Sequence, residues 1–189
     1  MAIQLRPQPL ISSGYKTVTP SEPGLNSMKI MVSACLTGEN CKYNGGNNLN
    51  EKVLALMNGT GESEETEMIT VCPEVMGGLP TPRIPSEVKD GVVVNRAGIC
   101  VDREFRLGAQ KCLEIAQREQ PDLIVLQSRS PSCGVRQRYD GTFSGRLIDA
   151  PGVTAQLLIE NGFRVVDVED LIENGFRAVG LEELQDEDL

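Results

Sequence analysis

Residues 126–145 read LQSRSPSCGVRQRYDGTFSG, and the fold of the whole chain is best interpreted outward from this stretch. It begins at the end of an apolar run, LIVLQ at 123–127, which is typical of a buried strand. Serines, an arginine, a proline and Cys133 follow at once, so the strand ends in a loop too polar for the core. In α/β proteins such loops carry the functional residues. We therefore expect the functional site around Cys133.

Strand-like and helix-like segments alternate on both sides of this stretch. The predicted elements are strands at 29–34, 68–71, 123–127 and 163–166, and helices at 50–57, 104–120 and 152–161. Alternation of this kind is typical of a parallel sheet, because each strand returns to the sheet through a crossover helix. We predict a single α/β domain with a mostly parallel sheet flanked by helices.

Two segments interrupt the alternation. Residues 72–85, CPEVMGGLPTPRIP, hold several prolines and a glycine pair, which predicts an ordered irregular loop or a flexible lid. Residues 92–102, VVVNRAGICVD, resemble a small hairpin that turns near Arg96 to Gly98.

The composition limits the possible functions. The 189 residues suffice for one good core, and the net charge of -9 makes a bulk nucleic-acid or anionic-membrane partner improbable. The chain lacks an export signal and an apolar run of about 18 residues, so we expect a cytoplasmic protein with reduced thiols. Histidine is absent, which leaves carboxylates, thiols, hydroxyls or a cofactor for catalysis.

The expected domain lies at residues 28–168. Residues 1–27 contain four prolines and no periodicity, which indicates a flexible N-terminal extension. Residues 169–189 form a C-terminal extension, in which LIENGFRVVDVED at 158–170 returns as LIENGFRAVGLEE before an acidic end. We assign no catalytic role to the C-terminal extension.

Three of the six cysteines directly follow predicted strands. Cys35, Cys72 and Cys133 should meet at one edge of the sheet, because parallel strands all end on the same side. Three thiols without a local CxxC pair are consistent with an iron–sulfur cluster, a zinc site, a redox thiol relay, or no shared site at all. Cys100 and Cys112 stand in strand-like and helix-like surroundings, where a buried structural cysteine is expected.

Three sequence blocks resemble the DUF523 family, whose characterised members are thiouracil desulfidases. They are VSACLTGENCKYNGG, VCPEVMGGLPTPRIPSEV and SRSPSCGVRQRYDGTFSGRLIDAPGVTAQLLIENGF, and the resemblance extends from Lys29 to about Val166. It implies a Rossmann-like domain with a [4Fe-4S] cluster held by Cys35, Cys72 and Cys133, one iron being open to substrate sulfur. It also implies Glu74 and Ser130 as catalytic residues.

The resemblance implies a non-redox reaction that replaces the sulfur of a small thiolated base or nucleoside, such as 2-thiouracil, by oxygen. Alternatives are an iron–sulfur or sulfur carrier without turnover, and a zinc-stabilised binding module. Cys41 is near enough to Cys35 in sequence to be a fourth ligand, although we favour an auxiliary free thiol.

Further side chains are candidates for substrate binding. Arg83 can hold a carboxylate network, Ser128 can hydrogen-bond a ligand, and Tyr139 and Phe143 can stack on a flat ring. Each also has an ordinary structural interpretation: the serines at 128, 130 and 132 as turn-formers, the aromatic rings as packing, and Glu74 as a helix-start residue. The sequence does not indicate the oligomeric state.

Overall fold

The computed structural model describes residues 28–57 and 66–171. In chain order, its elements are β1 (Lys29–Ser33), the 3₁₀ turn η1 (Ala34–Thr37), α1 (Glu51–Met57), β2 (Glu67–Val71), α2 (Pro73–Met76), β3 (Ser86–Lys89), β4 (Val92–Asn95), α3 (Asp102–Glu119), β5 (Leu123–Leu126), β6 (Arg138–Tyr139), β7 (Leu147–Ile148), α4 (Val153–Glu160), β8 (Val165–Asp167) and the 3₁₀ turn η2 (Val168–Asp170). The predicted N-terminal extension, and the C-terminal one from residue 172 on, lie outside the described residues.

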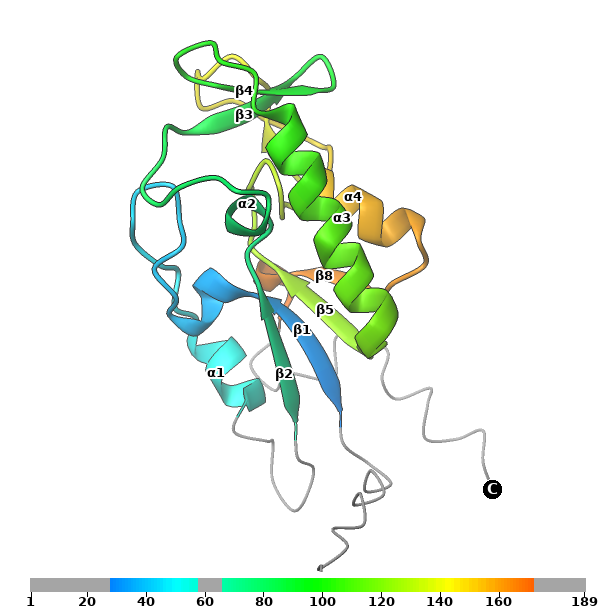
Figure 1. Cartoon of the computed structure of the whole chain (residues 1–189). Coiled ribbons are helices and arrows are strands. Elements are labelled where there is room, and N and C mark those ends of the chain that lie inside the picture. The colour runs from blue at the N-terminus through cyan, green and yellow to red at the C-terminus, as the bar shows by residue number, and fades with distance from the viewer. Residues whose placement is uncertain (1–27, 58–65, 172–189) are drawn as a thin grey trace, which may run out of the picture.

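The main sheet has the strand order β2-β1-β5-β8, and every neighbouring pair is parallel. All four strands and all three helices predicted from the sequence are present, which confirms the α/β fold. Val32 in β1 pairs with Thr70 of β2 on one side and with Val125 of β5 on the other. Because the strands are parallel, their carboxyl ends lie together at the edge facing the β3–β4 hairpin (Figure 1).

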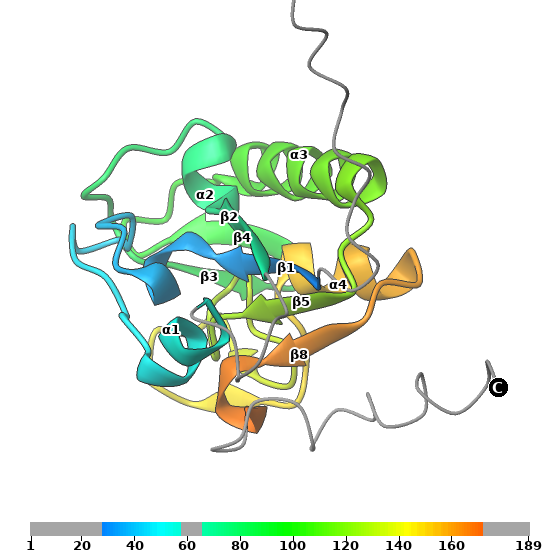
Figure 2. The same cartoon turned by 90° about the horizontal axis from the view of Figure 1, so that it is seen from below.

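Helices cover both faces of this sheet (Figure 2). On one face Met31 and Ile124 pack with residues of α3 and α4, including Cys112 and Leu158. On the other face the neighbouring strand residues, together with Val53 of α1, form a separate cluster. The division follows from strand geometry, because successive side chains of a strand point to opposite faces.

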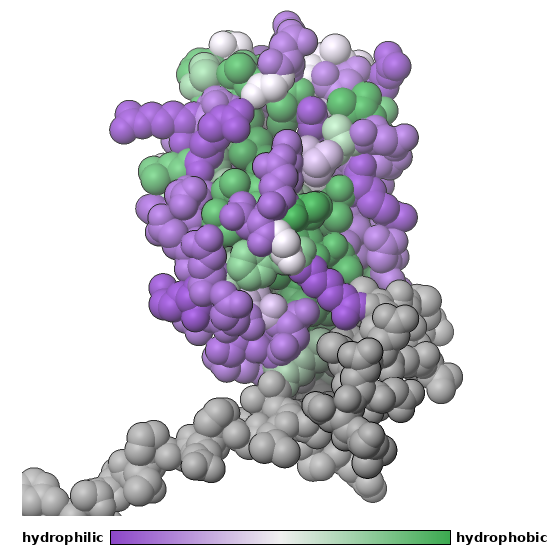
Figure 3. Space-filling view, turned by 90° about the vertical axis from the view of Figure 1, so that its right-hand side faces the viewer, coloured by the Kyte–Doolittle hydropathy of each residue, from purple (hydrophilic) through white to green (hydrophobic). Residues whose placement is uncertain are grey.

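Polar side chains cover much of the face shown in Figure 3, with apolar side chains visible between them. Among the described residues, no helix combines the length and the hydropathy that crossing a bilayer requires.

The hairpin prediction for residues 92–102 was wrong in its extent. The hairpin consists of β3 and β4 and turns at Asp90 and Gly91, which both have positive φ angles. This turn conformation suits an Asp-Gly pair. The predicted turn near Gly98 exists, but it is closed by one isolated bridge between Val94 and Cys100, after which the chain enters α3.

Two other expectations change with the structure. Residues 72–85 are irregular only after Met76, since they begin with the single helical turn α2. Cys100 is exposed, so its prediction as a buried cysteine was wrong; it lies just beyond β4, outside the apolar clusters. Cys112 is buried, as expected.

The contact between α2 and α3 requires glycine on both sides. A Cβ atom at Gly77 would stand 1.9 Å from the carbonyl oxygen of Glu104, and one at Gly108 would stand 1.9 Å from that of Pro73. The two backbones therefore touch. Because Cys72 and Glu74 adjoin Pro73, this contact also fixes the positions of both residues.

We predict that Gly108→Ala lowers the free energy of unfolding by about 2 kcal/mol or more, because the new methyl group overlaps the backbone of α2. Helix propensity alone would change stability in the opposite sense, by about 1 kcal/mol in favour of alanine. Urea unfolding of the variant and the wild type measures the difference.

Arg103→Ala, at an exposed position of the same helix, is the matched control and should stay close to wild type. A Gly108→Ala protein that is as stable as wild type, or more stable, would contradict the backbone contact.

Candidate active site

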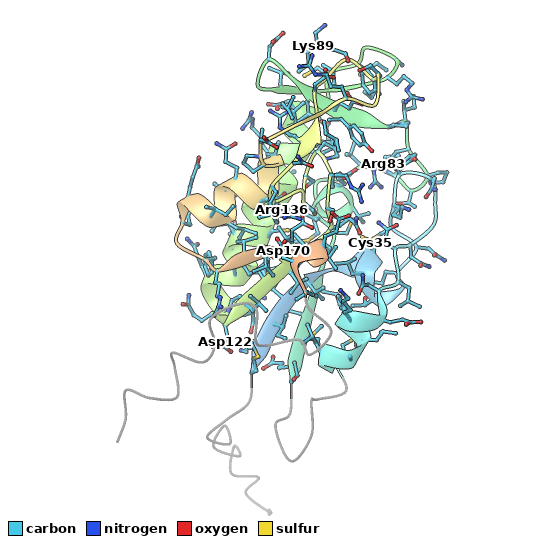
Figure 4. The ribbon with its side chains drawn as sticks, turned by 180° about the vertical axis from the view of Figure 1, so that it is seen from behind. Cys35, Arg83, Lys89, Asp122, Arg136 and Asp170 are labelled. Atoms are coloured by element: carbon cyan, nitrogen blue, oxygen red, sulfur yellow. The ribbon has the colours of Figure 1, made fainter. Side chains whose placement is uncertain are left out.

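A cavity of about 560 Å³ lies at the carboxyl edge of the main sheet. Its walls come from the loops after β1, β2 and β5, from the start of β3, and from the segment around β6. Every site residue predicted from the sequence lines it: Cys35, Cys41, Cys72, Glu74, Arg83, Ser128, Ser130, Cys133, Tyr139 and Phe143. Figure 4 shows Cys35 just beyond β1 and Arg83 in the loop that faces it. The fold thus brings together residues that span more than a hundred positions in sequence.

Three thiols reach this cavity from three separate strand ends. Cys35 is in η1 directly after β1, Cys72 is the residue between β2 and α2, and Cys133 is in the loop after β5. Cys35 and Cys133 are buried and Cys72 is half-buried. Ser33 contributes to this arrangement, because its hydroxyl group accepts a hydrogen bond from the Gln127 amide at 3.1 Å and so joins the end of β1 to the loop after β5.

The surroundings of Cys72 and Cys133 favour the neutral thiol. Burial raises the pKa of Cys133 far above its usual range. A hydrogen bond with Cys41, followed by burial, does the same for the pKa of Cys72. A free nucleophilic cysteine needs the opposite shift, toward the thiolate. A bound metal cation would supply the missing positive charge, because ligand cysteines release their protons on binding.

The three thiols are wall residues of one cavity. In residues 28–57 and 66–171, no three cysteine or acidic side chains are arranged to hold one metal ion. A structural zinc ion requires its sulfur ligands at about 2.3 Å from a common centre. Three cysteines on the walls of one cavity are compatible with a cluster of several metal atoms, in which each thiolate would bind a different metal atom.

Cys41 is a neighbour of two of the predicted ligands. Interaction with the Cys35 thiol contributes most to raising the pKa of Cys41 to about 11, whereas interaction with the Cys72 thiol opposes this rise. The Cys41 carbonyl oxygen accepts the Cys72 thiol at 3.8 Å and the Arg83 guanidinium at 3.1 Å. Cys41 is therefore part of the site, and its role as an auxiliary thiol stays a prediction.

Glu74 and Arg83 form a buried ion pair beside the thiols. Arg83 Nε donates to Glu74 Oε2 at 2.7 Å, with 7% and 15% of the two side chains exposed. Burial raises the pKa of Glu74, and the positive charge of Arg83 opposes that shift. The remaining Arg83 donors reach the Pro80 carbonyl, the Thr81 hydroxyl and the Cys41 carbonyl. Arg83 thus holds Glu74 in place at the cavity, while a direct contact with substrate stays a prediction.

The three serines after β5 differ in their partners. Ser128 donates to Asp167 at the end of β8, and Ser132 pairs with Thr154 at 2.8 Å in the interior. Ser130 accepts hydrogen bonds from the amides of Ser132 and Cys133, at 3.1 and 3.0 Å. Both bonds use the oxygen of Ser130 and leave its hydroxyl proton for a ligand in the cavity. Ser130 is therefore a turn-former and can still be a donor at the site.

Sequence reasoning missed Glu87 and Arg96, which also line the cavity. They come from the hairpin whose extent was mispredicted. The signal that could have revealed it is Asp90-Gly91, since this dipeptide between strand-like segments is a strong indicator of a two-residue hairpin turn.

Comparison with known proteins shows the family of this chain. The family described as 2-thiouracil desulfurase matches residues 30–170. A protein of Bacillus subtilis (strain 168), the uncharacterised YbbK, is 37% identical over 147 residues, which cover 72% of this chain and 93% of that protein. The solved structure of a [4Fe-4S]-dependent thiouracil desulfidase, TudS, matches with a TM-score of 0.70 and 35% identity, over 77% of this chain and 93% of that one. The chain therefore belongs to the 2-thiouracil desulfurase family, the one that its sequence blocks resemble.

Proposed function

We propose that this protein is a [4Fe-4S]-dependent desulfidase that converts a small thiolated pyrimidine, such as 2-thiouracil, into the oxo base and sulfide. One observation carries the proposal: three cysteines from three strand ends line the same cavity as a buried glutamate and a serine. Membership of the 2-thiouracil desulfurase family and the likeness to TudS support it. The cavity volume of about 560 Å³ is in the range of small-molecule sites.

The cluster ligands in this proposal are Cys35, Cys72 and Cys133. When bound, the cluster would supply an iron without a protein ligand, which acts as a Lewis acid toward the substrate sulfur. The reaction exchanges one atom: thiocarbonyl plus water gives carbonyl plus hydrogen sulfide. No electrons are transferred, so neither an oxidant nor a reductant is consumed.

The protein side chains supply the proton transfers. Glu74 takes a proton from the water that attacks the ring carbon and later returns it, while Arg83 keeps its carboxylate aimed at the cavity. Ser130 donates its hydroxyl proton to the ring or orients the water, since its oxygen is already held by two backbone amides. Tyr139 and Phe143 form the wall against which a flat ring can lie.

The proposed substrate is a free base or nucleoside. The net charge of -9 does not favour binding to the phosphate backbone of a whole nucleic acid.

The proposed compartment is the cytoplasm. None of the cysteines among the described residues forms a disulfide, and the cytoplasm is a compartment that keeps thiols reduced.

The first prediction from the proposed function concerns the ligands of the cluster. Cys133→Ser, purified and reconstituted without oxygen, is expected to lose most of its iron and acid-labile sulfide, because serine does not replace a thiolate toward iron. Metal analysis and the visible absorption of the cluster measure the loss. Cys100→Ser is the matched control, since Cys100 is exposed and does not line the cavity, and it should keep the full cluster.

Cys41→Ser separates an auxiliary thiol from a ligand. It should retain the cluster, because three cysteines suffice as ligands in this proposal.

Two results would contradict the proposed ligation. Full cluster content and activity in the Cys133→Ser variant would disprove the ligand assignment. A colourless wild-type protein with stoichiometric zinc would disprove the cluster itself.

The second prediction concerns the acid–base residue. Glu74→Gln should keep its cluster but release sulfide from 2-thiouracil about 10²-fold to 10⁴-fold more slowly, because the amide cannot accept the proton of water. Glu114→Gln, on the exposed side of α3, is the control and should react at the wild-type rate. Wild-type turnover by the Glu74 variant would exclude this role. A cluster-loaded wild-type protein that acts on no thiolated base would instead indicate a carrier.

A further inference from the structure

The wall of the cavity contains a residue in an unusual backbone conformation. Phe143 has a φ angle of 57°, in the left-handed region that bulky side chains rarely adopt. Such a conformation persists only where surrounding contacts impose it, and it concentrates at functional sites. Because Phe143 lines the cavity, whatever holds its backbone also sets the shape of the wall.

The carboxylate of Glu87 holds this backbone. A single oxygen, Oε2, accepts the amide of Gly141 at 3.0 Å and the amide of Phe143 at 2.9 Å. Glu87 is only 7% exposed, although it belongs to the short strand β3. Two amide donors to one buried carboxylate form a strong, charge-assisted arrangement. Glu87 therefore holds a loop that is distant in sequence, since Gly141 and Phe143 follow it by 54 and 56 positions.

Two further contacts hold the same loop against the hairpin. A Cβ atom at Gly141 would stand 2.7 Å from Lys89 Cα and 2.7 Å from the carbonyl oxygen of Val88, so the loop backbone touches β3 directly. The guanidinium of Arg96, just after β4, lies over the Phe143 ring with 5.6 Å between its central carbon and the ring centroid. A cation over an aromatic face restrains the orientation of the ring.

We propose that Glu87 is a positioning residue for substrate recognition: it holds Phe143 in the left-handed conformation and so builds the wall that receives a flat heterocyclic ring. This inference rests on the proposed function, because it concerns ring binding in the same cavity. Glu87 acts through the backbone of Phe143, whereas Glu74, Ser130 and the cysteines stand on other loops. Its loss should therefore weaken substrate binding more than it slows the chemical step.

The test uses the cluster-loaded full chain with 2-thiouracil. Glu87→Ala removes both hydrogen bonds and is expected to raise KM about ten-fold or more while kcat changes less than about three-fold. Glu87→Gln keeps an amide oxygen at the same place and should restore a KM close to wild type. Ser144→Ala, in the same loop but outside the cavity lining, is the matched control and should leave KM unchanged.

Backbone hydrogen exchange over residues 140–145 gives a readout that does not depend on turnover. Glu87→Ala should speed this exchange about ten-fold, whereas Glu87→Gln should not. If the wild type turns over no thiolated base, the proposed function fails, and the exchange alone decides whether the clamp exists.

Three results would overturn the inference. The first is a Glu87→Ala variant in which neither KM nor the exchange rate changes. The second is a Glu87→Ala variant in which kcat falls about ten-fold while KM stays at the wild-type value. The third is a Glu87→Gln variant whose KM is as high as that of Glu87→Ala.

If Glu87→Ala does not fold, Gly141→Ala replaces it, because the new methyl group pushes the loop off β3 and leaves Glu87 intact. Gly141→Ala should also raise KM about ten-fold, and a wild-type KM in that variant would refute the proposal.

Discussion

Parallel pairing of β1 with both β2 and β5 determines where the functional groups of this protein stand. The three strands end at the same edge, so the residues that follow them, Cys35, Cys72 and Cys133, are brought to one cavity without a local sequence motif. β1 and β5 are almost fully buried, and their side chains pack closely on both faces of the sheet. A register shift of either strand would therefore disrupt this packing and displace the thiol that follows the strand.

The loops beyond this edge depend on a few close contacts. The backbones of α2 and α3 touch through Gly77 and Gly108, and this contact sets the position of the Cys72–Glu74 segment. The loop after β5 is joined to η2 by ion pairs of Arg129 with Glu169 and of Arg136 with Asp170, the latter at 3.0 Å (Figure 4). Exposed pairs of this kind contribute little free energy, so they orient the loop more than they stabilise it. The buried polar bonds of Glu74 and Glu87 then place the side chains that face a substrate.

The parts of the structure with long apolar patterns were predictable from the sequence. LIVL at 123–126 and IMV at 30–32 are continuous apolar runs, because buried parallel strands have no solvent face. The ends of these two strands and of the strand at 68–71 indicated all three thiols. β3 was missed because its four residues, SEVK, include two charged ones, of which Glu87 turns inward to bind the loop at 141–143. The sequence suggested that Arg83 holds a carboxylate but did not identify Glu74 as its partner, because a contact across an irregular loop leaves no periodic signal. Cys100 was misjudged since a strand-like pattern does not say which cysteine is covered by the rest of the fold.

The central claim is that three thiols and a buried carboxyl group create a hydrolytic site for a thiocarbonyl group. Its most direct test is the anaerobic conversion of 2-thiouracil by the cluster-loaded protein in water labelled with heavy oxygen, with no reductant or oxidant present. We expect uracil that carries one labelled oxygen atom and an equal amount of sulfide. Uracil without the label, or a reaction that proceeds only when an electron donor or acceptor is added, would contradict the claim.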